Sequence, residues 1–306
     1  MLRLQLLWLL VPALGLFELA GHFWFAGRAP RQDEWRALSQ RIDRLKRPGE
    51  PLLIAPEWAQ PLARQAFGDA AFPLAELARA DLLGFRRVLE VSALGARTEE
   101  TRGWRQISEE ESGRFTLRIL ENPAPRRAKY RFVDRVAPAS LSVSVLVNGE
   151  ATFCPFTDQA RVTSGGLHGQ VTFPRERFRC PGGDAFFVGV TLIDDQDYRP
   201  RQCIWARPPE SGVLRLRFSN VPVGRSLRGF AGLSYFLFRD GLGQPITLRA
   251  SVGDKPVGAY THRDEWGFRG FEFATPGVEG VSDVEFQIAS EAGEARDFCF
   301  VAEAVE

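Results

Sequence analysis

The sequence predicts an α+β protein in three parts: an N-terminal membrane helix, a small α/β unit of the βαβ kind, and an antiparallel β-sandwich of the jelly-roll type. Three observations predict this order. An apolar run opens the chain, helix-period segments then alternate with short strands, and strand-like segments separated by turn residues fill the rest. We place the three parts at residues 1–30, 31–113 and 114–306.

The first 30 residues have the features of a signal anchor. Twelve uncharged residues, Leu6 to Phe17, form the apolar run, and the stretch extends to Gly27 if Glu18 and His22 are tolerated. The shorter run matches a secretory signal of about 7–15 apolar residues, and the longer one matches the ~20 residues of a membrane span. Because cleavage sites of the small-x-small type fit poorly here, we favour an uncleaved anchor over a cleaved signal peptide.

Glu18 and His22 form the polar pair of this predicted membrane helix. They are four residues apart, so on a helix they stand on one face, one turn from each other. The aromatic cluster Phe23-Trp24-Phe25 follows them, as is typical of the headgroup region of a membrane. We interpret the pair as marking the outer end of the anchor. The alternative is that it contacts a partner protein within the bilayer.

The predicted α/β unit begins with an amphipathic helix. In QDEWRALSQRIDRLKRPGE the apolar residues recur every three or four positions, and Pro48-Gly49 ends the helix. GEPLLIAP then predicts a buried strand, and EWAQPLARQAFGD predicts a helix with Gly68 near its C-terminal cap. PLAELARAD predicts a further helix and RRVLEVSA a second strand. Strand, helices and strand together indicate a right-handed βαβ crossover without a dinucleotide-binding glycine fingerprint.

The run GEPLLIAPEWAQPLARQAFGD, followed by FRRVLEVSALGAR, resembles the small extracytoplasmic segment of GT-C type membrane glycosyltransferases. The resemblance covers about residues 34–97, and the remainder resembles uncharacterised jelly-roll envelope proteins. In GT-C enzymes the catalytic acids belong to a loop between membrane helices. This chain offers one such helix at most, so no catalytic residue carries over. The resemblance implies a cell-envelope context related to glycans.

The region after the polar stretch ISEEESG, which we predict to be a turn, predicts the β-sandwich. Short strand-like segments run from FTLRIL to FCFVAEA, and turn pairs such as Asn148-Gly149 and Gly182-Gly183 separate them. In SLSVSVLV, apolar residues alternate with serines, which is typical of a strand with one buried face. Many short strands without intervening helices indicate an antiparallel sandwich.

All four cysteines lie in the predicted sandwich. An even number of dispersed cysteines behind a signal-like segment indicates disulfides in an oxidising compartment. Of the three possible connectivities we favour Cys154 with Cys180 and Cys203 with Cys299, the alternative being four buried thiols. The absence of any C-x-x-C spacing argues against a zinc site.

Three carboxylates, Asp194, Asp195 and Asp197, follow a predicted strand and make calcium the only candidate cofactor. Because Arg199 and Arg201 stand next to them, the alternative is a salt-bridged turn.

Candidate ligand-binding residues share an aromatic ring or a polar group suited to a sugar. They are Tyr198, Trp205, Tyr260, His262, Asp264 and Trp266. Rings that share a face can stack on sugar rings, whereas the alternative, which applies to Trp205 and Trp266 above all, is that they fill the core.

The composition and the absence of known catalytic motifs exclude several classes of function. Lys and Arg number 39 against 38 Asp and Glu, so the electrostatic footprint of a nucleic-acid-binding protein is absent. The G-x-S-x-G, H-E-x-x-H and phosphate-loop motifs are absent as well. We therefore predict a membrane-anchored, extracytoplasmic binding or scaffolding protein of the bacterial envelope. Its expected partners are the membrane and a glycan or an envelope protein. The alternatives are a carbohydrate-active enzyme or accessory subunit of an envelope glycosyltransferase, and an interaction protein that works through the N-terminal helix.

Overall fold

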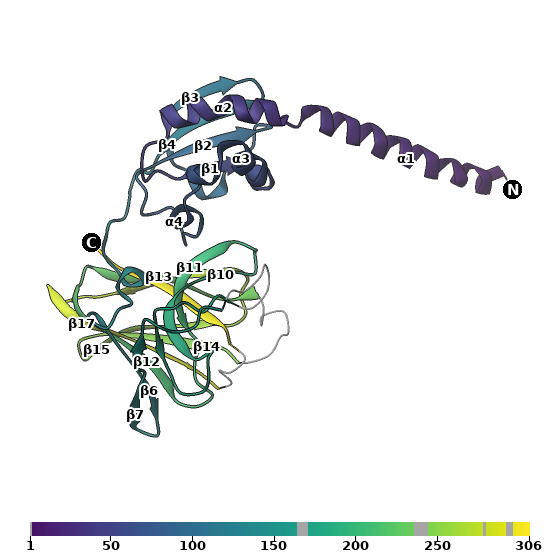
Figure 1. Ribbon diagram of the computed structural model, residues 1–306. Helices are drawn as coiled ribbons and strands as arrows, with labels where there is room; N and C mark the ends of the chain where they lie inside the picture. The colour runs from purple at the N-terminus through teal and green to yellow at the C-terminus, as the bar shows by residue number, and fades with distance from the viewer. Residues whose placement is uncertain (1, 164–170, 236–243, 278–279, 292–295) are drawn as a thin grey trace. The chain divides into compact units, whose positions relative to one another are not determined.

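The structure, a computed structural model, describes residues 2–163, 171–235, 244–277, 280–291 and 296–306, and of residues 2–10 and 25 it describes the backbone only (Figure 1). The chain divides into two compact units. One comprises Met1–Glu76 and Phe85–Pro125, and the other comprises Leu77–Gly84 and Arg126–Glu306.

The N-terminal segment is a continuous helix, α1 (Leu2–Arg28), as predicted. Glu18 and His22 are both exposed on it, and among the described contacts no hydrogen bond or ion pair joins them. The predicted membrane span is not supported, because no helix within the described residues is both long and apolar enough to cross a bilayer.

A four-stranded sheet forms the centre of the first unit. Across the sheet the strands are β1 (Leu52–Ala55), β2 (Arg87–Ala93), β4 (Phe115–Glu121) and β3 (Arg105–Ser112). β1 and β2 are parallel, which confirms the βαβ-like unit, and β4 is antiparallel to both β2 and β3.

Helices pack on this sheet through the apolar face that the sequence predicts. α2 (Gln32–Leu45) buries Trp35, Leu38 and Ile42, and the Trp35 ring lies 4.4 Å from the ring of Phe115 on β4. α3 (Gln60–Phe67) ends at Gly68, as predicted. This unit also contains 3-10 turns at Glu57–Ala59, Asp69–Ala71 and Glu99–Thr101.

Four predictions for this region need correction. The helix predicted over PLAELARAD is a single turn, α4 (Leu74–Leu77), because the next carbonyl, of Ala78, accepts a hydrogen bond from Gln202 N of the sandwich at 3.0 Å. ISEEESG is not a turn but forms part of β3, and FTLRIL lies in β4 of the α/β sheet, not in the sandwich. The chain therefore leaves the first unit for the last time at residues 125–126, not at 113.

The second unit is an antiparallel β-sandwich, as predicted. Its first sheet contains, in order, β16 (Arg269–Ala274), β13 (Ser226–Leu233), β18 (Phe298–Val305), β11 (Pro200–Ala206), β10 (Phe187–Asp194), β9 (Arg177–Arg179) and β8 (Phe156–Thr157), with β5 (Ala128–Arg131) also paired to β18. Its second sheet contains β15 (Lys255–His262), β14 (Ile246–Val252), β17 (Val281–Ser290), β12 (Val213–Pro222), β6 (Leu141–Val147) and β7 (Glu150–Phe153).

The main core of the sandwich lies between these two sheets. Phe132, from the 3-10 turn Phe132–Arg135, contacts the rings of Phe218 and Phe286 edge to face at 4.9 and 5.0 Å. Leu141, Val143 and Val145 of β6 point into this core, as predicted. Of the two serines between them, Ser142 is exposed as predicted but Ser144 is buried. A smaller apolar cluster around Phe187, Trp205 and Cys299 forms a second core, because the residues between those of the main core point to the opposite face of the first sheet.

Both predicted disulfides are present. Cys154 is bonded to Cys180, and Cys203 of β11 is bonded to Cys299 of β18. No cysteine is free. The pairing confirms the connectivity favoured from the sequence, and two disulfides are typical of proteins that fold in an oxidising compartment.

Candidate ligand-binding loops

Three loop segments of the sandwich are in contact, and two of them carry an exposed aromatic ring. They are residues 195–199 between β10 and β11, residues 263–268 between β15 and β16, and residues 234–235 after β13; we call them the aromatic loop platform. Gly267 N donates to Gln196 Oε1 at 3.0 Å, which joins the first two segments. The rings of Tyr198 and Tyr235 lie 4.8 Å apart, which joins the first and third.

Asp195 holds the first segment in shape. Its side chain is fully buried, and its carboxylate accepts hydrogen bonds from Arg201 Nε at 2.8 Å and from the backbone N–H groups of Asp197 and Arg199. These contacts form the salt-bridged turn that the sequence offered as the alternative to a calcium loop. Among the residues that the structure describes, no group of three or more His, Cys, Asp or Glu side chains is arranged to hold a metal ion.

The segment 263–268 is anchored by an ion pair. Arg296, which is almost fully buried, contacts both carboxylate oxygens of Asp264, and its Nε donates to the carbonyl of Gln244 at 2.7 Å. Gly267 has a positive φ of 68°, and a Cβ at this position would lie 2.5 Å from Asp197 Oδ2. A glycine is therefore needed where the two loops meet.

Two of the six predicted ligand-binding residues are large exposed aromatics on this platform. Tyr198 is 53% exposed and Trp266 is 55% exposed. Their rings are accessible while their loops are held by ion pairs to the buried arginines Arg201 and Arg296, so the platform offers apolar faces at fixed positions. Gln196 also belongs to the platform, and no sequence signal distinguished this residue from other polar loop residues.

Trp205 is not a ligand-binding residue, contrary to one of the predictions. It is 1% exposed, its ring stacks on Phe187 at 5.6 Å, and its Nε1 donates to the carbonyl of Ala185. It fills the second core because β11 turns this position toward the Cys203–Cys299 disulfide. The alternative assignment from the sequence, a core tryptophan, is correct for Trp205 but not for Trp266.

Tyr260 and His262 lie on β15 and point into the sandwich. The Tyr260 hydroxyl and His262 Nδ1 are 3.0 Å apart, and His262 is 1% exposed. Burial raises the pKa of Tyr260 to about 12. Burial also lowers the pKa of His262, and the carboxylates of Glu265 and Asp264 oppose that shift. These two side chains therefore pack inside the sandwich, next to residues 263–268, and are not placed to contact a ligand.

Because of His262, we expect the free energy of unfolding to decrease when the pH is lowered from about 6.5. The unfolded chain has a histidine pKa of about 6.5 and takes up a proton that the buried, neutral imidazole resists. The stabilisation is complete above that pH and is lost as the pH falls from about 6.5 toward the lowered pKa of the folded protein. Urea unfolding of the protein and of His262→Gln at pH 7.5 and 5.5 measures this. Parallel losses of stability in the two proteins would contradict it.

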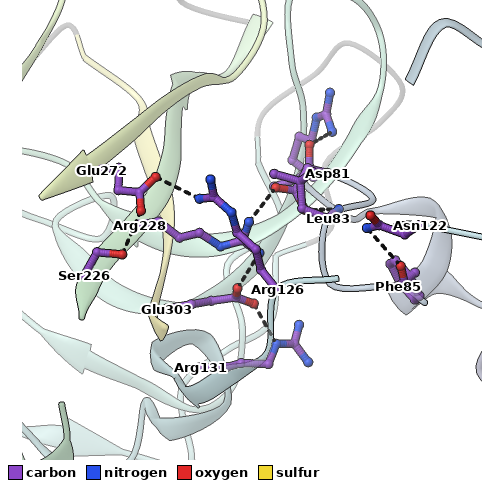
Figure 2. A network of polar contacts seen from close by, with 12 residues as sticks. Asp81, Leu83, Phe85, Asn122, Arg126, Arg131, Ser226, Arg228, Glu272 and Glu303 are labelled. Atoms are coloured by element: carbon purple, nitrogen blue, oxygen red, sulfur yellow. Dashed lines mark hydrogen bonds and ion pairs between the residues drawn. The ribbon is translucent and has the colours of Figure 1, made fainter. Parts of the chain in front are cut away.

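A second polar cluster, on the first sheet of the sandwich, connects the chain segments that cover this face (Figure 2). Arg228 is 6% exposed and lies 2.9 Å from Glu303 and 3.3 Å from Asp81. Glu303 also pairs with Arg131, while Glu272 accepts hydrogen bonds from Arg126 and from the Ser226 hydroxyl. Because each charge in the cluster is paired with another protein group, we interpret it as structural. It fixes residues 77–84 and 126–131 to the sheet.

Comparison with known proteins finds only distant structural similarities. No family model and no curated protein matches this chain. Among solved structures, the CBM51 module of the GH95 protein of Clostridium perfringens, in complex with methyl-galactose, is 7% identical, with 38% of this chain and 79% of that chain covered and a TM-score of 0.27. A family 29 carbohydrate-binding module from Piromyces equi is 12% identical, with 54% and 87% covered and a TM-score of 0.21.

A glycoside hydrolase family 43 arabinoxylan arabinofuranohydrolase from Bacillus subtilis, in complex with cellotetraose, is 17% identical, with 53% of this chain and 32% of that chain covered and a TM-score of 0.27. At these identities and TM-scores the similarities carry no argument about this chain. The assignment of a site therefore depends on the geometry of the loops themselves.

Proposed function

We propose that the protein is a carbohydrate-binding protein and that the aromatic loop platform binds an uncharged sugar. The observation that carries the proposal is the exposure of Tyr198 and Trp266 on two loops joined by the hydrogen bond between Gly267 and Gln196. A flat, exposed aromatic ring can pack against the apolar face of a sugar ring, and the neighbouring polar groups can bond its hydroxyls.

Charge on the platform favours a neutral ligand. Asp195 is paired with Arg201, and Asp264 is paired with Arg296, so the charges within each pair neutralise one another. The exposed carboxylate of Asp197 can accept hydrogen bonds from hydroxyl groups and repels acidic sugars.

Binding without turnover is the activity that this geometry supports. Asp195 and Asp264 hold the loops through their ion pairs, and the side chains of Tyr198 and Trp266 are both more than half exposed. The two disulfides support a location outside the cytoplasm, in an oxidising compartment such as the cell envelope.

A glycan array with the full-length chain, followed by calorimetric titration of the sugars that bind, tests the proposal. We expect Trp266→Ala and Tyr198→Ala each to weaken binding by about 10-fold or more, because each removes an aromatic contact worth roughly 1.5 kcal/mol. Trp58→Ala is the matched control, since Trp58 is 56% exposed but lies in the α/β unit. A silent array, or equal affinity of all three variants and the unmodified protein, would contradict the proposal.

A further inference from the structure

Residues 77–84 belong to the sandwich, although the residues before and after them in the chain, Glu76 and Phe85, belong to the α/β unit. We call residues 77–84 the inserted segment. Its Asp81 forms an ion pair with Arg228 of β13 at 3.3 Å (Figure 2). The inserted segment is therefore fixed to the sandwich while both of its ends continue into the other unit.

The inserted segment also contacts β11, the strand that follows the first platform loop. Gln202 N donates to the carbonyl of Ala78 at 3.0 Å, and Arg201 Nη1 donates to the carbonyl of Arg79 at 2.6 Å. β11 pairs with β18 only from Ile204 onward, whereas β10 pairs with the other edge along the whole strand. The inserted segment thus occupies the part of the β11 edge that β18 does not cover.

Arg201 connects the inserted segment to the platform. It is 9% exposed, and its Nε donates to Asp195 Oδ2 at 2.8 Å. Its guanidinium carbon also lies 5.6 Å from the centre of the Phe268 ring. Asp195 belongs to the loop that carries Tyr198, and Phe268 belongs to the loop that carries Trp266. One guanidinium group therefore contacts the inserted segment and both of these loops.

The contacts of Arg201 depend on one another. A guanidinium holds its N–H donors in a rigid planar fork, so one arginine can bind a carbonyl and a carboxylate in a fixed relative position. If the inserted segment moved away, Nη1 would lose the carbonyls of Arg79 and Ala80 and would be left without these acceptors in a buried position. If Arg201 then moved, the fully buried Asp195 carboxylate would lose its positive partner. Docking of the segment and support of the loops therefore stabilise each other.

We propose that the inserted segment regulates the aromatic loop platform. When it is docked, it keeps Arg201 in the position that fixes the loops of Tyr198 and Trp266, and when it undocks, these loops loosen. Because the segment is continuous with the α/β unit at both ends, it gives that unit a covalent route to the platform. The inference rests on the proposed function for the ligand of the platform, but the coupling itself is present, and is measured, without a sugar.

Hydrogen exchange of the full-length chain tests the coupling from the side of the segment. Asp81→Ala removes the ion pair with Arg228. The amides of Asp197 and Arg199, which donate to Asp195 Oδ1, should then exchange about 5-fold faster or more, although the substitution lies outside the loops. Asp283→Ala is the matched control, because Asp283 also pairs with an arginine and accepts a backbone hydrogen bond, but on β17 of the second sheet. It should leave both loop amides unchanged.

Asp195→Asn tests the coupling from the side of the loops. It removes the charge that pairs with Arg201, so the Gln202 amide, which reports docking of the segment through Ala78, should exchange about 5-fold faster or more. If Asp81→Ala raises exchange throughout the sandwich, the Gln202 amide in Asp195→Asn decides. Loop and Gln202 amides that respond no more than in Asp283→Ala would overturn the inference. A silent glycan array would remove the proposed ligand but would not change these exchange rates, so the two proposals fail separately.

Discussion

Replacing Cys203 and Cys299 together with alanine is expected to lower the free energy of unfolding of the sandwich by about 4–5 kcal/mol. The disulfide joins residues 96 positions apart, so in the unfolded chain it closes a long loop and removes much of its conformational entropy. Both cysteines are fully buried in the second core, next to Trp205, and alanine also leaves unfilled space there.

Denaturant titrations of the oxidised protein, the Cys203→Ala/Cys299→Ala variant and the Cys154→Ala/Cys180→Ala variant measure this effect. The second disulfide closes a loop with a sequence separation of only 26, so its removal should cost less, roughly 3–4 kcal/mol. Equal stability of the oxidised protein and the first variant would show that the loop-entropy argument does not apply to this sandwich.

Arg118→Ala is expected to destabilise the α/β unit by about 3–5 kcal/mol. Glu90 is fully buried on β2, and Arg118 Nη1 lies 3.1 Å from its Oε1 while Thr98 N donates to its Oε2. Arg118 Nε also donates to Glu109 Oε2 at 2.6 Å, and that ion pair lowers the pKa of Glu109. Removing the guanidinium leaves the Glu90 carboxylate buried without a positive partner, and a buried unpaired charge costs far more than a surface one.

Hydrogen exchange of the β2 and β4 amides in the full chain measures the stability of this unit by itself. The double variant Glu90→Leu/Arg118→Met is the control, because it removes both charges and keeps the apolar volume. It should recover most of the lost protection. If the double variant is as unstable as Arg118→Ala, the unpaired Glu90 carboxylate does not account for the loss.

The helices and strands could be predicted from the sequence because the spacing of their apolar residues follows the buried face of each element. Trp35, Leu38 and Ile42 recur at helical spacing and form the buried face of α2, and the alternation in Leu141–Val147 gives the buried face of β6. The disulfide connectivity could be predicted as well. The pairing of β3 with β4 could not, because the acidic sequence of β3 is exposed along nearly its whole length and carries no burial pattern.

The sequence by itself determined that this chain has an N-terminal helix, a βαβ-like unit and a sandwich with two disulfides. Only the tertiary structure decided which aromatic residues are accessible. Trp205 and Trp266 looked equivalent in the sequence, yet one is 1% exposed and the other 55%. The tertiary structure also brings Lys129 and Arg225, which are 96 residues apart in the chain, to one groove. The physical reason is that local periodicity records whether a side chain faces a core, whereas accessibility and the grouping of charges depend on which distant strands pair.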